Sequence, residues 1–327
     1  MSIRKCLKTS AVFIGTLIGA GFATGREILL FFGRSSPVVP LLSAFISGVF
    51  CSLFLQAGYK GLNIIPSKGG KLMLALFFIA VMVVYSAMIS ATDELISDYY
   101  NFTGSGPIVA VIIGLICIAI KDGLKWLNSL VVPMIVIMIV MIYFKAGGVK
   151  ISGGLNIQNA FAYASLNVFI GGFLVSKDGR IMNKNEILFT GAVTAAVLAA
   201  MTFMLYVIVI KSDNALMPVY DIAKSINLQF IAASVIFLAV ISTMAGCFEV
   251  LAAIGNALIK NIWVSGAVMA AAGILIAIAG FKIIIDYGYP LVSFVGLMYT
   301  ISVIATIIKG HNNKSARVML LEPGKGK

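Results

Sequence analysis

Charged residues are scarce in this 327-residue chain, where Asp, Glu, Lys and Arg together make up 11% of the sequence. Soluble globular domains contain about 25% charged and about 45–50% apolar residues, whereas 61% of this chain is hydrophobic. This composition excludes a soluble globular domain. Apolar runs of about 20 residues, enough for a helix to cross the hydrocarbon layer, recur along the chain without the alternation of β-barrel strands. We therefore predict an all-α integral membrane protein.

Residues that bind metals or form disulfides are also few. The cysteines Cys6, Cys51, Cys117 and Cys247 are widely spaced, and the single histidine, His311, lies near the C-terminus. The absence of a CxxC motif and of a Cys/His cluster argues against a zinc site and against disulfides. Since Ser/His/Asp, Cys/His and phosphate-loop arrangements are missing too, we expect neither an enzyme nor an organic cofactor.

Acidic residues are outnumbered by basic ones, with 12 Asp and Glu against 24 Lys and Arg and a net charge of +12. In a soluble protein this excess would suggest a nucleic-acid partner. Here the basic residues lie in the short connections between apolar runs and in the tails, so the positive-inside bias explains them better. We expect no nucleic-acid partner, and we predict a multi-pass plasma-membrane protein with both termini in the cytoplasm.

Ten apolar runs are predicted to span the bilayer as helices. The first five cover residues 8–32, 38–60, 71–98, 107–121 and 124–146 and form one half of the chain, about 8–146. The second five cover residues 157–177, 186–210, 226–259, 262–281 and 287–308 and form the other half, about 157–308. Residues 1–310 are then one transmembrane domain, and residues 311–327 are a basic cytoplasmic tail. A short amphipathic helix is expected outside, beginning near Pro218.

Glycines interrupt the first predicted span. The segment from Phe13 to Glu27 reads FIGTLIGAGFATGRE, and each glycine costs about 1 kcal/mol relative to alanine in a helix interior. This pattern predicts an unwound helix near residues 19–21, which a membrane tolerates only where the freed backbone groups face protein or a water-filled cavity.

The freed backbone groups of this segment are candidate ligands. We expect the N–H groups of Gly19, Ala20 and Gly21 to bind an anionic group of a solute, and the carbonyl groups of Gly15 and Ile18 to hold a cation. Close helix packing is the alternative, because the glycines of this segment form two GxxxG pairs.

Residues 161–180 repeat this pattern about 150 residues later, with an apolar helix interrupted at Gly171 and Gly172 and ended by charge. Five predicted spans separate the two segments, and an odd number makes the second half enter from the opposite face. This is typical of an inverted repeat, whose paired discontinuous helices, here spans one and six, mark the binding site. Asn167, Gly171 and Gly172 are expected to contact the solute, although Asn also commonly ties membrane helices together.

The eighth predicted span places the hydroxyl groups of Ser242 and Thr243 near mid-membrane. With carbonyl groups from span one, they would suit Na⁺; alternatively they bond to carbonyls of their own helix. Glu249 follows on the same span, and an intramembrane carboxylate usually faces a partner or a pathway. Its candidate partners are Arg4, Lys5 or Lys8, with which it would form an inner gate, or alternatively Lys177 and Arg180.

The third predicted span carries Tyr85 near its middle and several acids, among them Asp93, near its outer end. The Tyr85 hydroxyl is a candidate donor to the solute, and packing between helices is the equal alternative. The outer acids are expected to include a partner for Arg26, so that Arg26, Asp93 and Glu249 are the candidate gating residues.

The segment from Gly15 to Glu27, followed by Phe31 and Phe32, resembles the first helix of the bacterial YkvI-like membrane proteins. That family is similar, more distantly, to the amino acid–polyamine–organocation superfamily, which has the LeuT-type fold of five plus five inverted helices. The resemblance implies that residues 19–21 hold a substrate carboxylate. It also implies a sodium site formed by the Gly15 and Ile18 carbonyls with Ser242 and Thr243.

Two departures from the superfamily pattern bear on the coupling ion. Phe22 stands where relatives with a second sodium site have Asn, and no lysine lies in the middle of span five. We therefore expect a secondary transporter that moves an amino acid or a related carboxylate or amine by alternating access, coupled to Na⁺ rather than H⁺. The alternative is a non-transporting, ligand-sensing subunit of the same fold, as in spore germinant receptors. Substrate identity and oligomeric state do not follow from the sequence.

Overall fold

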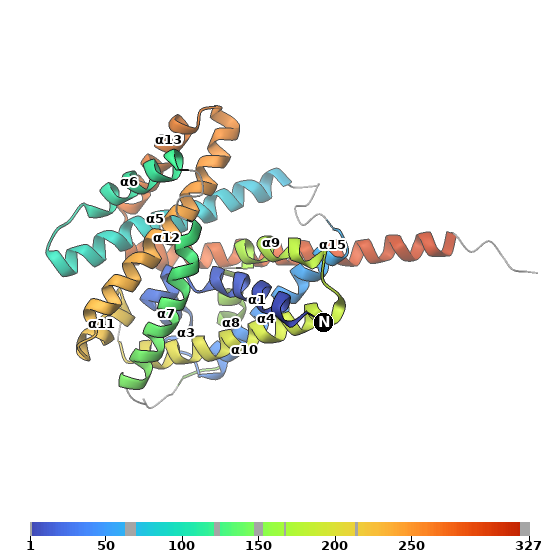
Figure 1. The fold of residues 1–327 in the computed structure, drawn as a ribbon, viewed down its shortest axis with the longest axis horizontal. Helices are drawn as coiled ribbons and strands as arrows, with labels where there is room; N and C mark the ends of the chain where they lie inside the picture. Colours follow the sequence, from blue (N-terminus) through green and yellow to red (C-terminus); the bar gives the residue numbers. More distant parts are fainter. Residues whose placement is uncertain are drawn as a thin grey trace, which may run out of the picture.

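The computed structural model describes residues 2–62, 70–120, 125–146, 153–166, 168–212 and 215–320, and helices account for most of them (Figure 1). The first half contains α1 (Ile3–Leu17), α2 (Ala20–Thr24), α3 (Arg26–Phe32), α4 (Val38–Tyr59), α5 (Gly70–Tyr100), α6 (Ser105–Ala119) and α7 (Lys125–Ala146). The second half contains α8 (Ile157–Leu166), α9 (Val168–Gly179), α10 (Lys184–Val209), α11 (Pro218–Ser225), α12 (Gln229–Ile259), α13 (Ile262–Ala277), α14 (Phe281–Ile283), the π-helical turn η1 (Ile284–Gly288) and α15 (Tyr289–Leu320).

Five helical segments of the described chain are long and apolar enough to cross a membrane. They are Val38–Tyr59, Lys71–Asp98, Lys184–Val209, Gln229–Ile259 and Phe281–Ile308. Three shorter apolar helical segments accompany them, Ser105–Ala119, Leu130–Ala146 and Ile262–Ala277. The chain is a multi-pass, all-helical membrane protein, and α11 is the short amphipathic helix expected near Pro218.

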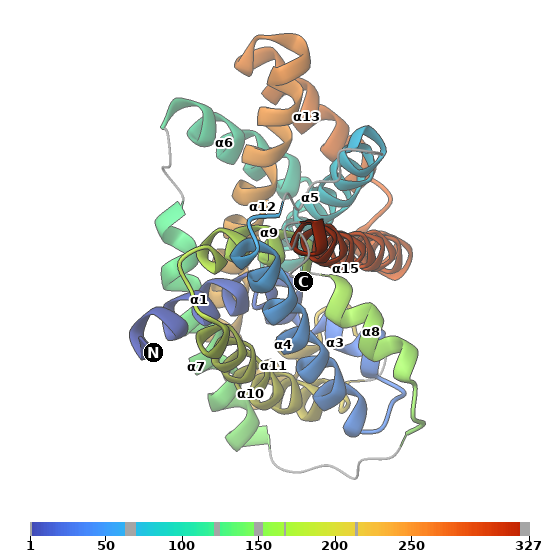
Figure 2. The same cartoon turned by 90° about the vertical axis from the view of Figure 1, so that its right-hand side faces the viewer.

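The helices pack in two groups, each of which combines helices from both halves of the chain. In the first group, α4 packs against α8, α9 and α10, and α1 packs against α9 and α10. In the second, α5, α6, α12 and α13 pack against one another. Figures 1 and 2 show the second group together at the top of both views, with the first group below it. The short α2 contacts α12, so the middle of the first predicted span reaches the second group.

Glycines allow very close packing within the first group. A Cβ atom at Gly48 of α4 would lie 2.5 Å from the Gly191 carbonyl oxygen of α10. A Cβ atom at Gly179, the last residue of α9, would lie 2.1 Å from the Leu55 carbonyl oxygen of α4. Small residues of this kind let membrane helices approach backbone to backbone, so α4, α9 and α10 form one tightly packed unit.

Candidate functional site

A cavity of about 640 Å³ opens where α1 ends and α2 begins, and we call it the α1–α2 cavity. Residues of α1, α2, α3, α5, α7, α8, α9, α12 and α15 line it, so both helix groups contribute. Most of its wall is apolar. The polar and charged side chains in the wall are those of Lys8, Thr16, Glu27, Ser242, Thr243 and Tyr289.

The backbone between α1 and α2 leaves the helical path. Ile18 has φ −86° and ψ 72°, and Gly19 is extended. The backbone hydrogen bonds of α1 end with Ile18 N donating to the Ile14 carbonyl, and those of α2 begin with Ala23 N donating to the Gly19 carbonyl. The last carbonyl groups of a helix and the first N–H groups of the next have no helical partner, so such groups meet at this cavity.

The α12 hydroxyl groups lie beside this turn of the backbone. Ala20 N donates to Thr243 Oγ1 at 3.4 Å, and a Cβ atom at Gly19 would lie 3.4 Å from the same oxygen. Gly15 and Ser242 also line the cavity. Ile18 is buried and its side chain is not part of the wall. Six of the seven predicted ligands of the first segment and of α12 therefore line one cavity, namely Gly15, Gly19, Ala20, Gly21, Ser242 and Thr243.

Gly21 makes room for a side chain of α3, which the sequence did not reveal. A Cβ atom at Gly21 would lie only 1.7 Å from Glu27 Oε1, so the Glu27 carboxyl group occupies the space that a side chain at position 21 would need. Glu27 is 6% exposed and lines the cavity. Its acidic side chain in an otherwise apolar run is the sequence signal that could have assigned it to the site, but the sequence-based prediction left it out.

Arg26 has a different partner from the one expected. Its Nη2 atom lies 2.5 Å from Asp286 Oδ1, and its Nη1 atom donates to the Ala215 carbonyl at 2.9 Å. The prediction of a partner among the span-three acids is wrong, because Gly25, with φ +76°, turns α3 toward η1. Asp286 belongs to that π-helical turn, a feature often found at functional sites.

Asp93 has a structural partner at the start of α6. Its Oδ1 atom accepts hydrogen bonds from Ser105 Oγ at 3.0 Å and from Gly106 N at 2.9 Å. The first N–H groups of a helix need such an acceptor, and Asp93 supplies it. This contact, rather than a contact with Arg26, fixes the position of the Asp93 carboxylate.

Glu249 lies outside the α1–α2 cavity. It is half-buried and interacts electrostatically with Cys117 of α6. In the described part of the chain it forms no ion pair, and its expected partner Lys5 instead binds Glu186, with 2.8 Å between Lys5 Nζ and Glu186 Oε2. Glu186 also closes a capping box with Asn183 at the start of α10. The ion pair of Lys5 is therefore formed with α10, not with α12.

Tyr85 is fully buried on a different face of α5 from the one that lines the cavity. Its ring centroid lies 6.0 Å from that of Phe248, and a Cβ atom at Gly273 would lie 2.4 Å from its ring. The candidate role in solute binding is not supported, since the ring is wedged between α12 and α13. Packing between helices, the alternative left open by the sequence, describes Tyr85 correctly.

The glycine pair of the second segment does not interrupt a helix. Gly171 and Gly172 lie inside α9, which begins at Val168, while α8 ends at Leu166. Asn167 lies outside the described residues. The prediction of a break at the glycine pair is therefore wrong.

These two glycines serve helix packing. A Cβ atom at Gly171 would lie 2.5 Å from Thr16 Oγ1 of α1, and one at Gly172 would lie 2.6 Å from the Phe54 ring of α4. Neither glycine lines the α1–α2 cavity. The expected solute contacts at Gly171 and Gly172 are thus replaced by contacts between helices.

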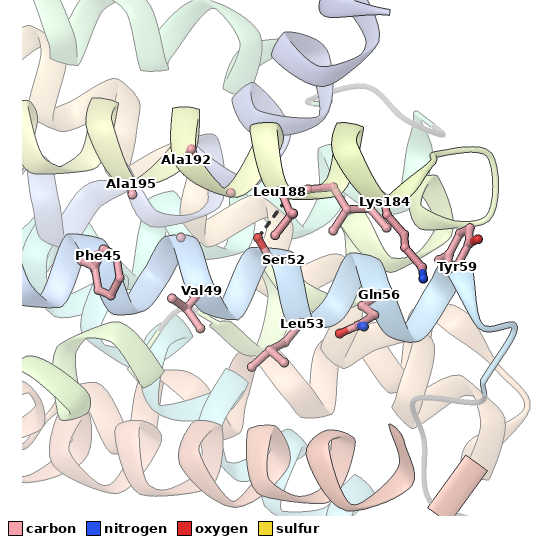
Figure 3. Close-up of a pocket in the computed structure, with 13 residues that line it drawn as sticks. Phe45, Val49, Ser52, Leu53, Gln56, Tyr59, Lys184, Leu188, Ala192 and Ala195 are labelled. Atoms are coloured by element: carbon pink, nitrogen blue, oxygen red, sulfur yellow. Dashed lines mark hydrogen bonds between the residues drawn. The ribbon is translucent and has the colours of Figure 1, made fainter. Parts of the chain in front are cut away.

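A second cavity, of about 470 Å³, is a groove between α4 and α10 (Figure 3). Phe45, Val49 and Leu53 lie along its α4 side, and Ser52 Oγ donates to the Ile187 carbonyl at 3.5 Å. The groove contains none of the predicted site residues.

Comparison with known proteins gives structural neighbours and no sequence relatives. No protein-family model matches the chain, and no curated protein matches it. The resemblance to the YkvI-like proteins therefore stays a prediction.

Two solved structures are similar to this one. The first is a nucleobase-cation-symport-1 family transporter in a closed conformation with bromovinylhydantoin bound; the TM-score is 0.56, the identity 14%, and the match covers 88% of this chain and 73% of that chain. The second is a mutant of the manganese transporter of Eremococcus coleocola; the TM-score is 0.52, the identity 12%, and the match covers 91% of this chain and 76% of that chain. At this identity the likeness shows the fold: the chain is folded as these two transporters are.

Proposed function

We propose that this protein is a secondary transporter that moves a small solute across the membrane by alternating access. In this proposal the ten predicted spans form the LeuT-type five-plus-five arrangement, with span one discontinuous between α1 and α2. The observation that carries the proposal is the α1–α2 cavity, where the end of α1, the start of α2 and the Thr243 hydroxyl meet. Binding sites at interrupted helices are typical of such transporters, and both structural neighbours are transporters.

The proposed solute is an amino acid or a related small carboxylate or amine. The N–H groups of Gly19, Ala20 and Gly21 would bind its carboxylate, and apolar side chains of α5 and α7 would surround the rest of it. A cavity of about 640 Å³ lies within the range of about 300–1,000 Å³ that is usual for small-molecule sites.

The proposed coupling ion is Na⁺. Its ligands would be the carbonyl groups of Gly15 and Ile18 and the hydroxyl groups of Ser242 and Thr243. Uncharged oxygen atoms are suitable ligands for a hard cation, and the C-terminal end of α1 adds the negative end of a helix dipole. Removal of the Thr243 hydroxyl group is the direct test of this assignment.

Two ion pairs flank the cavity along the first span and would act as gates. Arg26 and Asp286 lie on one side of it, and Lys5 and Glu186 lie on the other. If the N-terminus is cytoplasmic, the first pair is the outer gate and the second the inner gate. Alternating access then requires each pair to separate while the other holds.

The decisive experiment uses the purified protein in liposomes with an inward sodium gradient, with no gradient, and with an inward proton gradient. Accumulation of a radiolabelled amino acid that depends on the sodium gradient supports a Na⁺-coupled transporter. Accumulation that follows the proton gradient instead supports H⁺ coupling, and binding without flux supports the ligand-sensing alternative.

A matched pair of variants tests the Thr243 assignment in the same assay. Thr243→Val removes the hydroxyl group and keeps the shape, so we expect sodium stimulation to be lost. Thr202→Val is the control, because Thr202 is a buried threonine of α10 outside the cavity wall and bonds to carbonyls of its own helix, Leu198 at 2.7 Å and Ala199 at 3.5 Å. Equal sodium stimulation in both variants would remove Thr243 from the ion site.

A further inference from the structure

The Glu27 carboxyl group is the most unusual polar group in the α1–α2 cavity. Its side chain is 6% exposed, and its Oε2 atom has no hydrogen-bond partner. Within the described part of the chain, Glu27 forms no ion pair. A buried carboxylate without a cation or a hydrogen bond is costly, so a partner from outside the chain would stabilise it.

The nearby basic side chains do not supply that partner. Arg26 is adjacent in sequence, but its guanidinium group binds Asp286 and the Ala215 carbonyl. Lys8 lines the same cavity, yet it precedes the end of α1 at Leu17 by nine residues, which is about 14 Å along a helix. Glu27 is therefore an acceptor that faces a cavity and lacks a donor.

The surroundings of Glu27 fit an organic ammonium group better than a bare metal ion. Tyr163 and Tyr289 are both within electrostatic range of its carboxyl group. Tyr289 also lines the α1–α2 cavity, whereas Tyr163, which packs against Phe31 and Phe32, does not. A carboxyl group that shares a cavity wall with an aromatic ring suits an ammonium group, which aromatic faces also attract.

We propose that Glu27 accepts a hydrogen bond from a protonated amine of the solute, so that the cavity selects solutes with a free amine. This inference rests on the proposed function, because it names the solute class for the same cavity. A zwitterionic amino acid would place its ammonium group at Glu27, and a simple alkylamine would share that contact. Gly21 contributes by leaving room for the Glu27 carboxyl group.

Binding to the purified full-length protein tests this proposal separately from transport. Ligand stabilisation against heat is measured first with the twenty amino acids. For each one that binds, the N-acetyl derivative, the amine without the carboxylate and the acid without the amine follow. We expect the amino acid and the amine to bind, and the N-acetyl derivative and the amine-free acid to bind at least about 10-fold more weakly.

Variants then assign the contact to Glu27. We expect Glu27→Gln to weaken binding of the amine about 10- to 100-fold, the usual effect of losing a hydrogen bond between charged groups. Glu27→Asp keeps the charge and should retain part of the affinity, which excludes misfolding as the cause. Glu94→Gln is the control, because it removes a half-buried acid of α5 that does not line the cavity, and it should bind as the unaltered protein does.

Several results would overturn the proposal. The first is equal binding of amine-containing and amine-free solutes, and the second is unchanged amine binding by Glu27→Gln. The third is a Glu27→Gln variant that loses only the pH dependence of uptake, because Glu27 would then be a proton carrier. Failure of the whole panel to bind would overturn it too. If amine binding depends on Glu27 but no solute accumulates in liposomes, the inference stands and the transport function falls. If only amine-free solutes accumulate, the transport function stands and the inference falls.

Discussion

The segments 13–27 and 161–180 contain similar glycine patterns, yet the structure uses them in opposite ways. In the first, Gly19 is extended between two helices and Gly25 has a positive φ, so the backbone changes direction twice. Gly21 lies within α2, where it makes room for a carboxyl group at the cavity. The glycines of this segment shape a site.

In the second segment the glycines lie inside a regular helix. Gly171 and Gly172 belong to α9 and bring it close to Thr16 of α1 and Phe54 of α4. Glycine thus allows the helix to be interrupted in the first segment and allows neighbouring helices to pack closely in the second. The surroundings differ: the glycines of the first segment line a cavity, whereas those of the second lie against the neighbouring helices α1 and α4.

The largest effect on this comparison should come from Gly25→Ala. The left-handed backbone conformation at this position costs about 1–2 kcal/mol for a residue with a side chain. A Cβ atom there would also lie 2.6 Å from Val209 and 2.8 Å from Val219, and such overpacking adds about 1–3 kcal/mol. We expect a strong fall in the thermal midpoint of the purified protein. Gly61→Ala separates the two costs, since Gly61 also has a positive φ but no atom within 4 Å; an equal fall in both variants would mean that crowding at Gly25 contributes nothing.

Gly21→Ala should affect the site more than the fold. The added methyl group displaces the Glu27 carboxyl group, while alanine in a helix is favoured over glycine by about 1 kcal/mol. We expect amine binding to fall about 10-fold or more, the effect of losing one charged hydrogen bond, with a nearly unchanged thermal midpoint. Unaltered binding in the titration would show that Gly21 does not position Glu27.

Gly172→Ala should do the reverse. The methyl group would lie 2.6 Å from the Phe54 ring, so overpacking of about 1–3 kcal/mol is only partly offset by the gain of about 1 kcal/mol in helix propensity. We expect a lower thermal midpoint and unchanged affinity for the solute. A loss of affinity at full stability would restore Gly172 to the binding site.

The smallest effect is expected for Gly246→Ala on α12. Gly246 lines the cavity, and a Cβ atom there would have no atom within 4 Å. The variant should gain up to about 1 kcal/mol of stability from helix propensity and bind the solute with little change. A large loss of binding would place the solute against this part of α12.

The helical composition of the chain follows from the sequence, because apolar length is a strong signal in membranes. The helices predicted over residues 38–60 and 226–259 are confirmed by α4 and α12. The helix end near Gly19 is also where the sequence indicates it. A continuous helix from 287 was predicted, but the π-helical turn η1 precedes α15, and α15 continues to Leu320.

Contacts between distant helices were harder to predict. The sequence alone allows Arg26 to pair with any of the outer acids. Its pairing with Asp286 follows from the direction of α3, which the positive φ of Gly25 sets where this residue packs against α10 and α11. Tyr85 carried two plausible roles and Gly172 only one, a helix break, but the role of each residue depends on which face of its helix meets a neighbouring helix. Hydrophobic periodicity gives little help here, since these membrane helices are apolar on most faces.

The close fit of the Glu27 carboxyl group against Gly21 has a consequence for sequence variation. A side chain at position 21 and an acid at position 27 compete for the same space, so the two positions cannot change independently. Substitutions there should be non-additive in a double-mutant cycle. Among related sequences, a larger residue at position 21 should accompany loss of the acid at position 27, and under the proposed function such proteins would bind a different solute.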